Sequence, residues 1–410
     1  MTRLVAVLCM IYVHVPDGQS ERVLYAMSWL DATSLLQGLL IEGPGRAGAS
    51  LLSIVSGYLT AKILLGKCYS ISTLYKRRFR SILVPMFIWS LASYTVYSIA
   101  SVWRVTFIDD ASTLLDHLNI LFFLTDIPHG ATMHLAFLRD LFVCIVLSPL
   151  LIMGLRRSPI LLLSLLACVY LGLHQHQGLI VLRPLVLFAF SIGLYLALRN
   201  TPLDAVDHRW RLWVGLTVLL ALLVMMSNGN QLASAETALA SVGIDLRETI
   251  LYPLCRLFGS LAIWTLMPVV FRAKSFKRAH RLAPYVFTTF CSHQLVLNCI
   301  YEMMWVPLFG TSTDGVYIVW FVMAPILSLL MGIAVVHAAS AVTADLGMMI
   351  TGGRKPSLRF DKPLSNALAR VQNYLATELK NNRRALRSLW IRFHERYQTP
   401  DRFKRLRLRG

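Results

Sequence analysis

Residues 315–341 read GVYIVWFVMAPILSLLMGIAVVHAASA, with no acidic residue, lysine or arginine along the whole stretch. The hydrocarbon core of a bilayer is about 30 Å thick, and a helix needs about 20 apolar residues to cross it. Apolar runs recur along the chain, which predicts an all-α, polytopic membrane bundle. We place ten transmembrane segments at residues 3–16, 45–64, 81–102, 133–154, 158–174, 178–198, 211–227, 250–271, 283–305 and 315–341.

The composition agrees with this interpretation. Hydrophobic residues make up 56% of the 410 positions and charged residues only 15%, whereas soluble domains have about 25% charged residues. So few charges indicate that many apolar side chains face lipid. No small-residue cleavage site follows the first apolar stretch, so we expect that stretch to remain as the first span.

The net charge of +19 is distributed in a way that favours a membrane protein over a nucleic-acid-binding protein. Basic loops stay in the cytoplasm during membrane insertion. Segments 62–80 and 272–281 are basic, whereas segments 104–132 and 227–250 are acidic on balance. This alternation predicts ten spans with both termini in the cytoplasm.

The C-terminal region differs from the rest of the chain. We divide the protein into a transmembrane domain, residues 1–345, and a basic cytoplasmic tail, residues 346–410. From Arg354 onward there are 16 Lys and Arg against 4 Asp and Glu, a net +12. Apolar residues recur at helical spacing over 364–379, which favours an amphipathic helix on the anionic membrane surface. The alternative is a disordered basic tail.

Ionisable residues inside spans are costly, so they are the first candidates for function. Arg3 and His14 are 11 positions apart, about three helical turns, which places both on one face about 16 Å apart. A neutral histidine can act as a general base, and Arg3 can bind a carboxylate or phosphate. Alone, a membrane histidine is equally well explained by a structural hydrogen bond.

Further candidates carry positive charge. Arg77 and Arg80 share a helix face before the third span and suit the phosphates of an acyl-CoA, although any cytoplasmic loop is basic. Arg46 lies at the edge of the second span, and His293 is a second intramembrane histidine. Arg139 precedes Asp140, and because adjacent residues point apart on a helix, we expect each to pair with another span. The seven cysteines contain no CxxC pair, so no metal site is expected.

Several short motifs follow one another along residues 1–341. They combine small, basic and histidine residues in the order of the predicted spans. The motifs are Arg-x10-His at Arg3 and His14; Ser56, Gly57 and Tyr58; Arg-x-x-Arg at Arg77 and Arg80 before Pro85; His134, Leu135, Ala136, Phe137 and Leu138, with Ala136 where an aromatic residue is usual; and His293.

In this order the motifs resemble the acyltransferase family 3 membrane O-acyltransferases, most of all the exopolysaccharide (succinoglycan) succinyltransferases. The resemblance implies a multi-pass protein of the bacterial inner membrane that moves a succinyl or acetyl group from cytoplasmic acyl-CoA to a hydroxyl of a lipid-linked or exported glycan. His14 would be the base or acyl carrier, assisted by Arg3. Acyl-CoA would be a co-substrate at Arg77 and Arg80, with no permanently bound cofactor.

The remaining site residues would bind substrate. Arg46 or Arg139 would hold the second carboxylate of a succinyl group, and His293 would orient the donor. Partners would be membrane lipids and polysaccharide synthesis proteins, and not nucleic acid. One rival function is a transporter or flippase for an anionic glycan or lipid, which predicts no acyl-CoA consumption and two pseudo-symmetric halves; no internal repeat is seen. Another is a sensor or assembly subunit of a polysaccharide machine.

Overall fold

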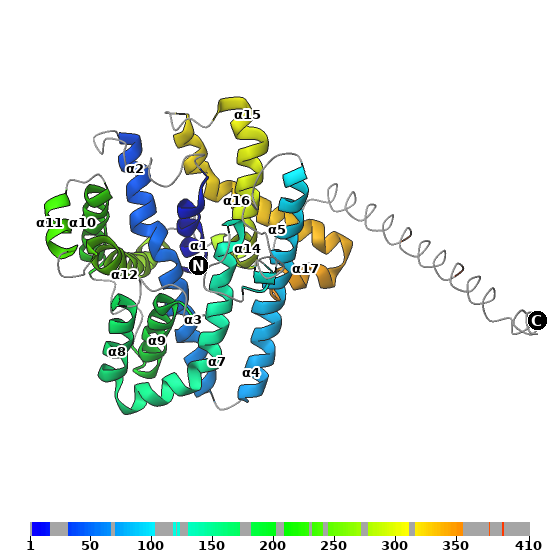
Figure 1. The fold of residues 1–410 in the computed structure, drawn as a ribbon. Coiled ribbons are helices and arrows are strands. Elements are labelled where there is room, and N and C mark those ends of the chain that lie inside the picture. Colours follow the sequence, from blue (N-terminus) through cyan, green and yellow to red (C-terminus); the bar gives the residue numbers. More distant parts are fainter. Residues whose placement is uncertain are drawn as a thin grey trace, which may run out of the picture.

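The computed structural model describes residues 2–16, 32–66, 70–102, 118–119, 121–123, 130–172, 182–201, 209–228, 232–240, 245–271, 278–310 and 316–355, and the single positions 377 and 388. These residues form helices and connecting turns and contain no β-strand (Figure 1). The all-α prediction is therefore confirmed. The amphipathic helix predicted over 364–379 lies outside the described residues.

The described helices fall into two groups by length. Six helical stretches are long and apolar enough to cross a membrane: Thr33–Leu65, Ile71–Ala100, Met133–Arg157, Trp210–Ser227, Leu246–Val270 and Tyr317–Val342. Shorter apolar helices cover Thr2–His14, Pro159–Gly172 and Pro184–Leu198. The chain is thus a multi-pass membrane protein. Each of the ten predicted segments overlaps a helix, while ten crossings and cytoplasmic termini stay predictions.

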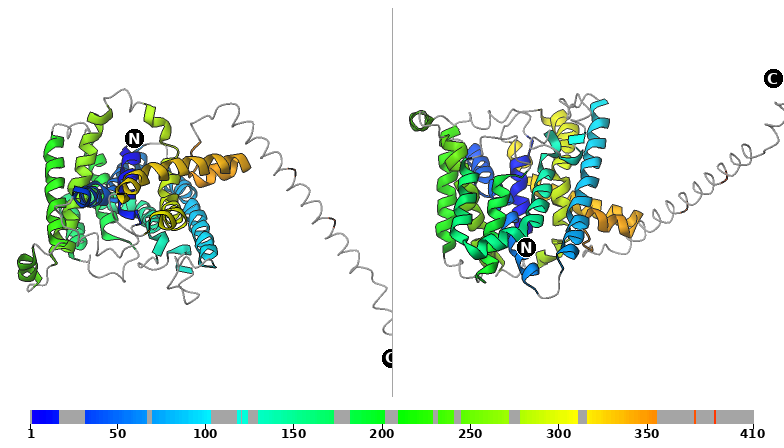
Figure 2. Two further views of the ribbon diagram at one scale, coloured as in Figure 1. Left: turned by 90° about the horizontal axis from the view of Figure 1, so that it is seen from above. Right: turned by 60° about the horizontal axis from the view of Figure 1, so that its bottom comes forward.

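The helices follow one another as a bundle of antiparallel and oblique elements (Figures 1 and 2). Their bounds are α1 (Thr2–Ile11), α2 (Ala32–Leu40), α3 (Arg46–Leu65), α4 (Ile71–Arg78), α5 (Val84–Val102), α7 (Ala136–Arg157), α8 (Pro159–Gly172), α9 (Pro184–Leu198), α10 (Trp210–Asn228), α11 (Ala233–Ala240), α12 (Tyr252–Phe271), α14 (Val286–Ile300), α15 (Val306–Phe309), α16 (Tyr317–Val342) and α17 (Ala344–Ile350).

The second span begins earlier than predicted. The predicted span covers residues 45–64. Instead, Ile41–Gly45 forms a widened π-helical turn that joins α2 to α3. A proline lacks the amide hydrogen that an α-helix requires, and a wider turn accommodates it without ending the helix.

Helix α3 packs closely against α9 and α1 through glycines. A Cβ atom on Gly57 would lie 2.1 Å from the Phe190 carbonyl oxygen, and one on Gly193 would lie 2.0 Å from the Ile54 carbonyl oxygen. A Cβ atom on Gly48 would lie 2.6 Å from the Ala6 carbonyl oxygen. Small residues allow such backbone contact in membranes. These contacts hold α1 inside the bundle, beside α3, α12, α14 and α16 (Figure 1).

Candidate active site

Three histidines from different elements meet in the bundle. His14 ends the 3₁₀ turn after α1, His134 lies in the turn before α7, and His293 lies in α14. The ring centroids are 4.6 Å apart for His134 and His293, 5.2 Å for His14 and His293, and 6.2 Å for His14 and His134. His134 and His293 are buried, and His14 is partly buried. We call these three residues the histidine cluster.

Hydrogen bonds fix two of the three rings. His134 contacts the Gln294 side-chain oxygen at 2.7 Å and the Cys291 carbonyl at 3.0 Å. His293 donates from Nδ1 to the Phe290 carbonyl at 2.7 Å. That bond leaves Nε2 of His293 as an acceptor, and it is buried without a hydrogen-bond partner in the described structure. A buried ring nitrogen with a lone pair is suited to accept a proton.

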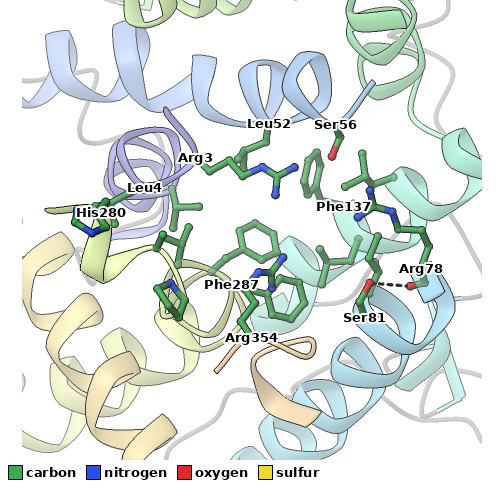
Figure 3. A pocket seen from close by; sticks show the side chains of 18 of the residues that line it. Arg3, Leu4, Leu52, Ser56, Arg78, Ser81, Phe137, His280, Phe287 and Arg354 are labelled. Atoms are coloured by element: carbon green, nitrogen blue, oxygen red, sulfur yellow. Dashed lines mark hydrogen bonds between the residues drawn. The ribbon is translucent and has the colours of Figure 1, made fainter. Parts of the chain in front are cut away.

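A cavity of about 520 Å³ opens beside this cluster. Its lining includes arginine, lysine and histidine side chains from four places in the sequence: Arg3 in α1, Arg78 at the end of α4, His280 and Arg281 before α14, and Arg354 and Lys355 after α17. Figure 3 shows the guanidinium groups of Arg3 and Arg354 directed into one space, with Arg78 at its side. We call it the cationic cavity.

The apolar part of the cationic cavity borders the histidine cluster. Phe137 and Phe290 both line the cavity, and their ring centroids are 5.7 Å apart. The Phe290 ring also lies 5.9 Å from His134 and 6.1 Å from His293. Phe290 therefore lies next to both the cationic cavity and two of the three imidazoles, and Phe137 packs against it. A molecule with an anionic end and a reactive apolar end would fit across this boundary.

The arginines that line the cavity are not all those that the sequence predicted to bind the acyl donor. Arg3 lines the cationic cavity. Arg77 and Arg80 are exposed and are not among the lining residues, whereas Arg78 between them is partly buried and lines it. Arg78 lies four residues after the buried Leu74, and that helical spacing was a signal for the inward position.

Arg46 is partly buried and paired within the bundle. It forms an ion pair with the buried Glu42 one turn earlier, and its guanidinium carbon lies 4.0 Å from the Tyr252 ring centroid. Its position within the continuous stretch Thr33–Leu65, not at the edge of a span, explains this pairing.

Arg139 pairs with its own neighbour. Its guanidinium donates to Asp140 Oδ1 at 2.9 and 2.7 Å and to the Phe123 carbonyl at 2.6 Å. The expectation that Arg139 pairs with another span is thus wrong, because its long side chain bends back to the carboxylate. Asp140 is fully buried and also lies 3.7 Å from Arg183 of the turn before α9. Separate burial of these charges would cost more than their pairing.

Parts of the histidine cluster and of the cationic cavity have no clear signal in the sequence. His134 was noted only within a motif, and Arg183, which lies 3.7 Å from the buried Asp140, was not noted. Arg354 and Lys355 lie beyond the last predicted span. Many other basic residues follow them, so the sequence does not single out either one. The described residues contain no group of three His, Cys, Asp or Glu side chains arranged to hold a metal ion.

The fold and the site define a multi-pass helical membrane protein with three clustered histidines beside a cationic cavity. A family described as "Acyltransferase domain", acyltransferase family 3, matches residues 1–344. The chain belongs to this family of acyltransferases.

The chain is similar in sequence to the succinoglycan biosynthesis protein ExoH of Rhizobium meliloti (strain 1021). It is 27% identical over 365 residues, which cover 88% of this chain and 92% of the relative. No solved structure matches the chain.

Proposed function

We propose that the protein transfers an acyl group from cytoplasmic acyl-CoA to a hydroxyl of an exopolysaccharide or other surface glycan, at the bacterial inner membrane. Membership of the acyltransferase family supports the reaction class. The glycan acceptor is proposed because a relative is a succinoglycan biosynthesis protein. The acceptor would be a lipid-linked or exported glycan, supplied by polysaccharide synthesis proteins.

One observation carries the proposal: the cationic cavity and the histidine cluster share the Phe137–Phe290 boundary. Acyl-CoA has phosphates at one end and a thioester at the other. Guanidinium groups bind phosphates strongly and in a defined geometry. With its phosphates near Arg3 and Arg78, the donor would extend past the aromatic pair and present its thioester to the histidines.

The proposed chemistry begins with proton transfer. A ring nitrogen of His14 takes the proton of a sugar hydroxyl, and the oxygen attacks the thioester carbonyl. The carbon–sulfur bond breaks as the ester bond forms, and the CoA thiolate leaves and takes up the proton from His14. His293, with its tautomer fixed by Phe290, orients the reacting groups. An acyl-histidine intermediate on His14 is the variant in which the imidazole itself attacks first.

Other charged residues would attract the donor or bind the acyl group. Arg77 and Arg80, exposed on the same helical stretch as Arg78, would attract the anionic donor before it enters the cavity. The acyl group would be succinyl or acetyl. Arg46 and Arg139 were proposed for the second carboxylate of a succinyl group, and since both have carboxylate partners, a succinyl group would compete with Glu42 or Asp140. Arg183 lies 3.7 Å from Asp140 and would face the same competition.

The test uses His14→Ala in a strain that lacks the native copy, with NMR of the purified surface polysaccharide. We expect O-acyl signals to fall by about 100-fold or more, the usual contribution of a general base. His337→Ala is the matched control, because His337 also lies in an apolar helix but hydrogen-bonds Tyr285, away from the cluster. Unchanged acylation in His14→Ala at normal protein level would refute the assignment.

Mass analysis of the same polysaccharide separates succinyl from acetyl groups. It also addresses the alternative, a transporter or flippase for an anionic glycan or lipid. That function predicts loss of exported polysaccharide with no change in the acylation of what is exported. It also predicts that purified protein consumes no acyl-CoA.

A further inference from the structure

The chain beyond the last long helix contributes a wall of the cationic cavity. After α16 and α17, residues 351–355 form a turn that lies outside the matched acyltransferase domain, residues 1–344. Gly352 and Gly353 have φ angles of +66° and +83°. A Cβ atom on Gly352 would also lie 2.5 Å from the Ser81 carbonyl oxygen. The turn therefore requires glycine, both for its backbone conformation and for its close approach to the start of the third span.

Hydrogen bonds anchor this turn to the bundle. The Ile350 carbonyl accepts from Thr288 Oγ1 at 3.3 Å and from Trp89 Nε1 at 3.5 Å. The buried Thr351 hydroxyl accepts from the Arg354 amide at 3.2 Å and lies 2.7 Å from the Arg354 carbonyl oxygen. Arg354 is thus held in a defined position against two spans and is not part of a loose tail.

The Arg354 side chain is directed into the cavity. Its Nη1 donates to the Thr351 carbonyl at 2.7 Å, and its guanidinium carbon lies 5.0 Å from the Phe287 ring centroid. These two contacts orient the guanidinium and leave other N–H groups facing the space it shares with Arg3 (Figure 3). A guanidinium has five N–H donors, so this arrangement retains donors for a ligand.

The electrostatics of the cavity favour an anion. Arg3, Arg78 and Arg354 are all partly buried, and none of them pairs with a carboxylate within the described residues. Burial, together with the nearby charge of Arg78, lowers the pKa of Arg354 from its ordinary value. Arg3 also experiences the charges of Arg354 and Arg78. Like charges held this close repel each other, and a phosphate between them would remove that repulsion.

We propose that Arg354 is a donor-binding residue, which with Arg3 holds a phosphate of the acyl donor from a turn outside the acyltransferase domain. This inference rests on the proposed function. It means that the domain alone does not complete the donor site. The same phosphate chemistry occurs in anionic lipid headgroups, so the experiment separates the two sources.

The experiment measures equilibrium binding of CoA to the purified full-length protein in phosphatidylcholine nanodiscs. We expect Arg354→Ala to weaken CoA binding by about 10–100-fold, because it removes a charge-assisted contact. Arg156→Ala is the matched control, since Arg156 is an exposed arginine at the end of α7 and does not line the cavity. It should bind CoA as the wild type does.

One further variant separates a loss of folding from a loss of binding. Arg354→Lys preserves the charge but lacks the planar fork, so we expect an intermediate loss. If Arg354→Ala fails to fold, this lysine variant decides the question, and unchanged CoA binding overturns the inference. Arg354→Ala with wild-type CoA affinity also overturns it, while the O-acylation assay on His14 still stands.

The lipid arm repeats the measurement in nanodiscs that contain phosphatidylglycerol, with mass spectrometry of retained lipid. Retained phosphatidylglycerol that is lost in Arg354→Ala, with CoA affinity unchanged, would assign the guanidinium to a headgroup and refute the donor role. Absence of CoA binding in the wild type, together with absence of acyl transfer, would overturn both this inference and the proposed function.

Discussion

Two sets of arginines lie within the bundle, and they differ in their partners. Arg46 and Arg139 each form an ion pair with a buried carboxylate, Glu42 and Asp140. Arg3, Arg78 and Arg354 face one cavity and have no carboxylate partner among the described residues. The sequence offers no simple distinction between the sets, because both lie in or beside apolar helices.

The comparison teaches that position alone does not make an intramembrane arginine functional. A paired guanidinium is neutralised by its own protein, and its removal exposes a buried carboxylate. An unpaired guanidinium in a cavity is neutralised only when an anion enters. The first set should therefore control stability, and the second should control binding of the donor.

The largest effect is expected for Asp140→Ala. If this change does not lower stability, the proposed difference between paired and unpaired arginines is wrong. This change leaves Arg139 buried without its carboxylate and removes the partner of Arg183. Loss of one member of a buried ion pair costs about 3–5 kcal/mol. Thermal unfolding of the detergent-solubilised protein should show a large decrease in Tm. An unchanged Tm would mean that the pair contributes nothing to the folded state.

Arg3→Ala should have the opposite profile. Removal of one cavity guanidinium should raise the KM for acyl-CoA by about 10–100-fold, which corresponds to about 1.5–3 kcal/mol of lost charge-assisted bonding. Because it also removes repulsion from Arg78 and Arg354, Tm should stay the same or rise. Steady-state kinetics with acyl-CoA tests the first effect and thermal unfolding the second. A fall in Tm with an unchanged KM would place Arg3 in the structural set.

Glu42→Gln tests the paired set at a second site. The amide retains a hydrogen-bond acceptor for Arg46, and Arg46 keeps its contact with the Tyr252 ring. We therefore expect a smaller loss of stability, about 1–3 kcal/mol, with the KM for acyl-CoA unchanged. A raised KM without loss of stability would move Arg46 to the binding set.

The smallest effects are expected for Arg77→Ala and Arg80→Ala. Both side chains are exposed, and exposed charges attract a ligand through solvent, where salt screens them. Each variant should change the KM for acyl-CoA by only about twofold to fivefold, or less than about 1 kcal/mol, and the difference should vanish at high salt. An increase in KM as large as that expected for Arg3→Ala would show that they bind the donor directly.

How much of this could be predicted from the sequence differs between the fold and the site. Long apolar runs are sufficient to predict a helical bundle, because lipid imposes the length of each span. The predicted start of the second span at residue 45 was too late because the helix continues through Pro44, and tertiary packing decides whether a helix tolerates a proline. Arg3 and His14 were identified from one helix, whose spacing is local.

The rest of the site depends on tertiary structure. His134 and His293 are 159 positions apart in sequence, and only the packing of α14 against the turn before α7 brings them together. Arg78 differs from Arg77 and Arg80 only in the helix face it occupies, and four arginines and lysines within five residues conceal that face. Arg354 depends on a glycine turn whose position against Ser81 no local pattern reveals.

The Phe137–Phe290 pair affects how much of the acyl donor would be lost to hydrolysis. A thioester beside an imidazole also reacts with water, and exclusion of water from such a site suppresses that side reaction. Phe137 and Phe290 line the cationic cavity, and the Phe290 ring also lies 5.9 Å from His134 and 6.1 Å from His293. The balance between ester formation and hydrolysis of the donor would therefore depend on two aromatic side chains that lie next to the histidines and take no part in proton transfer.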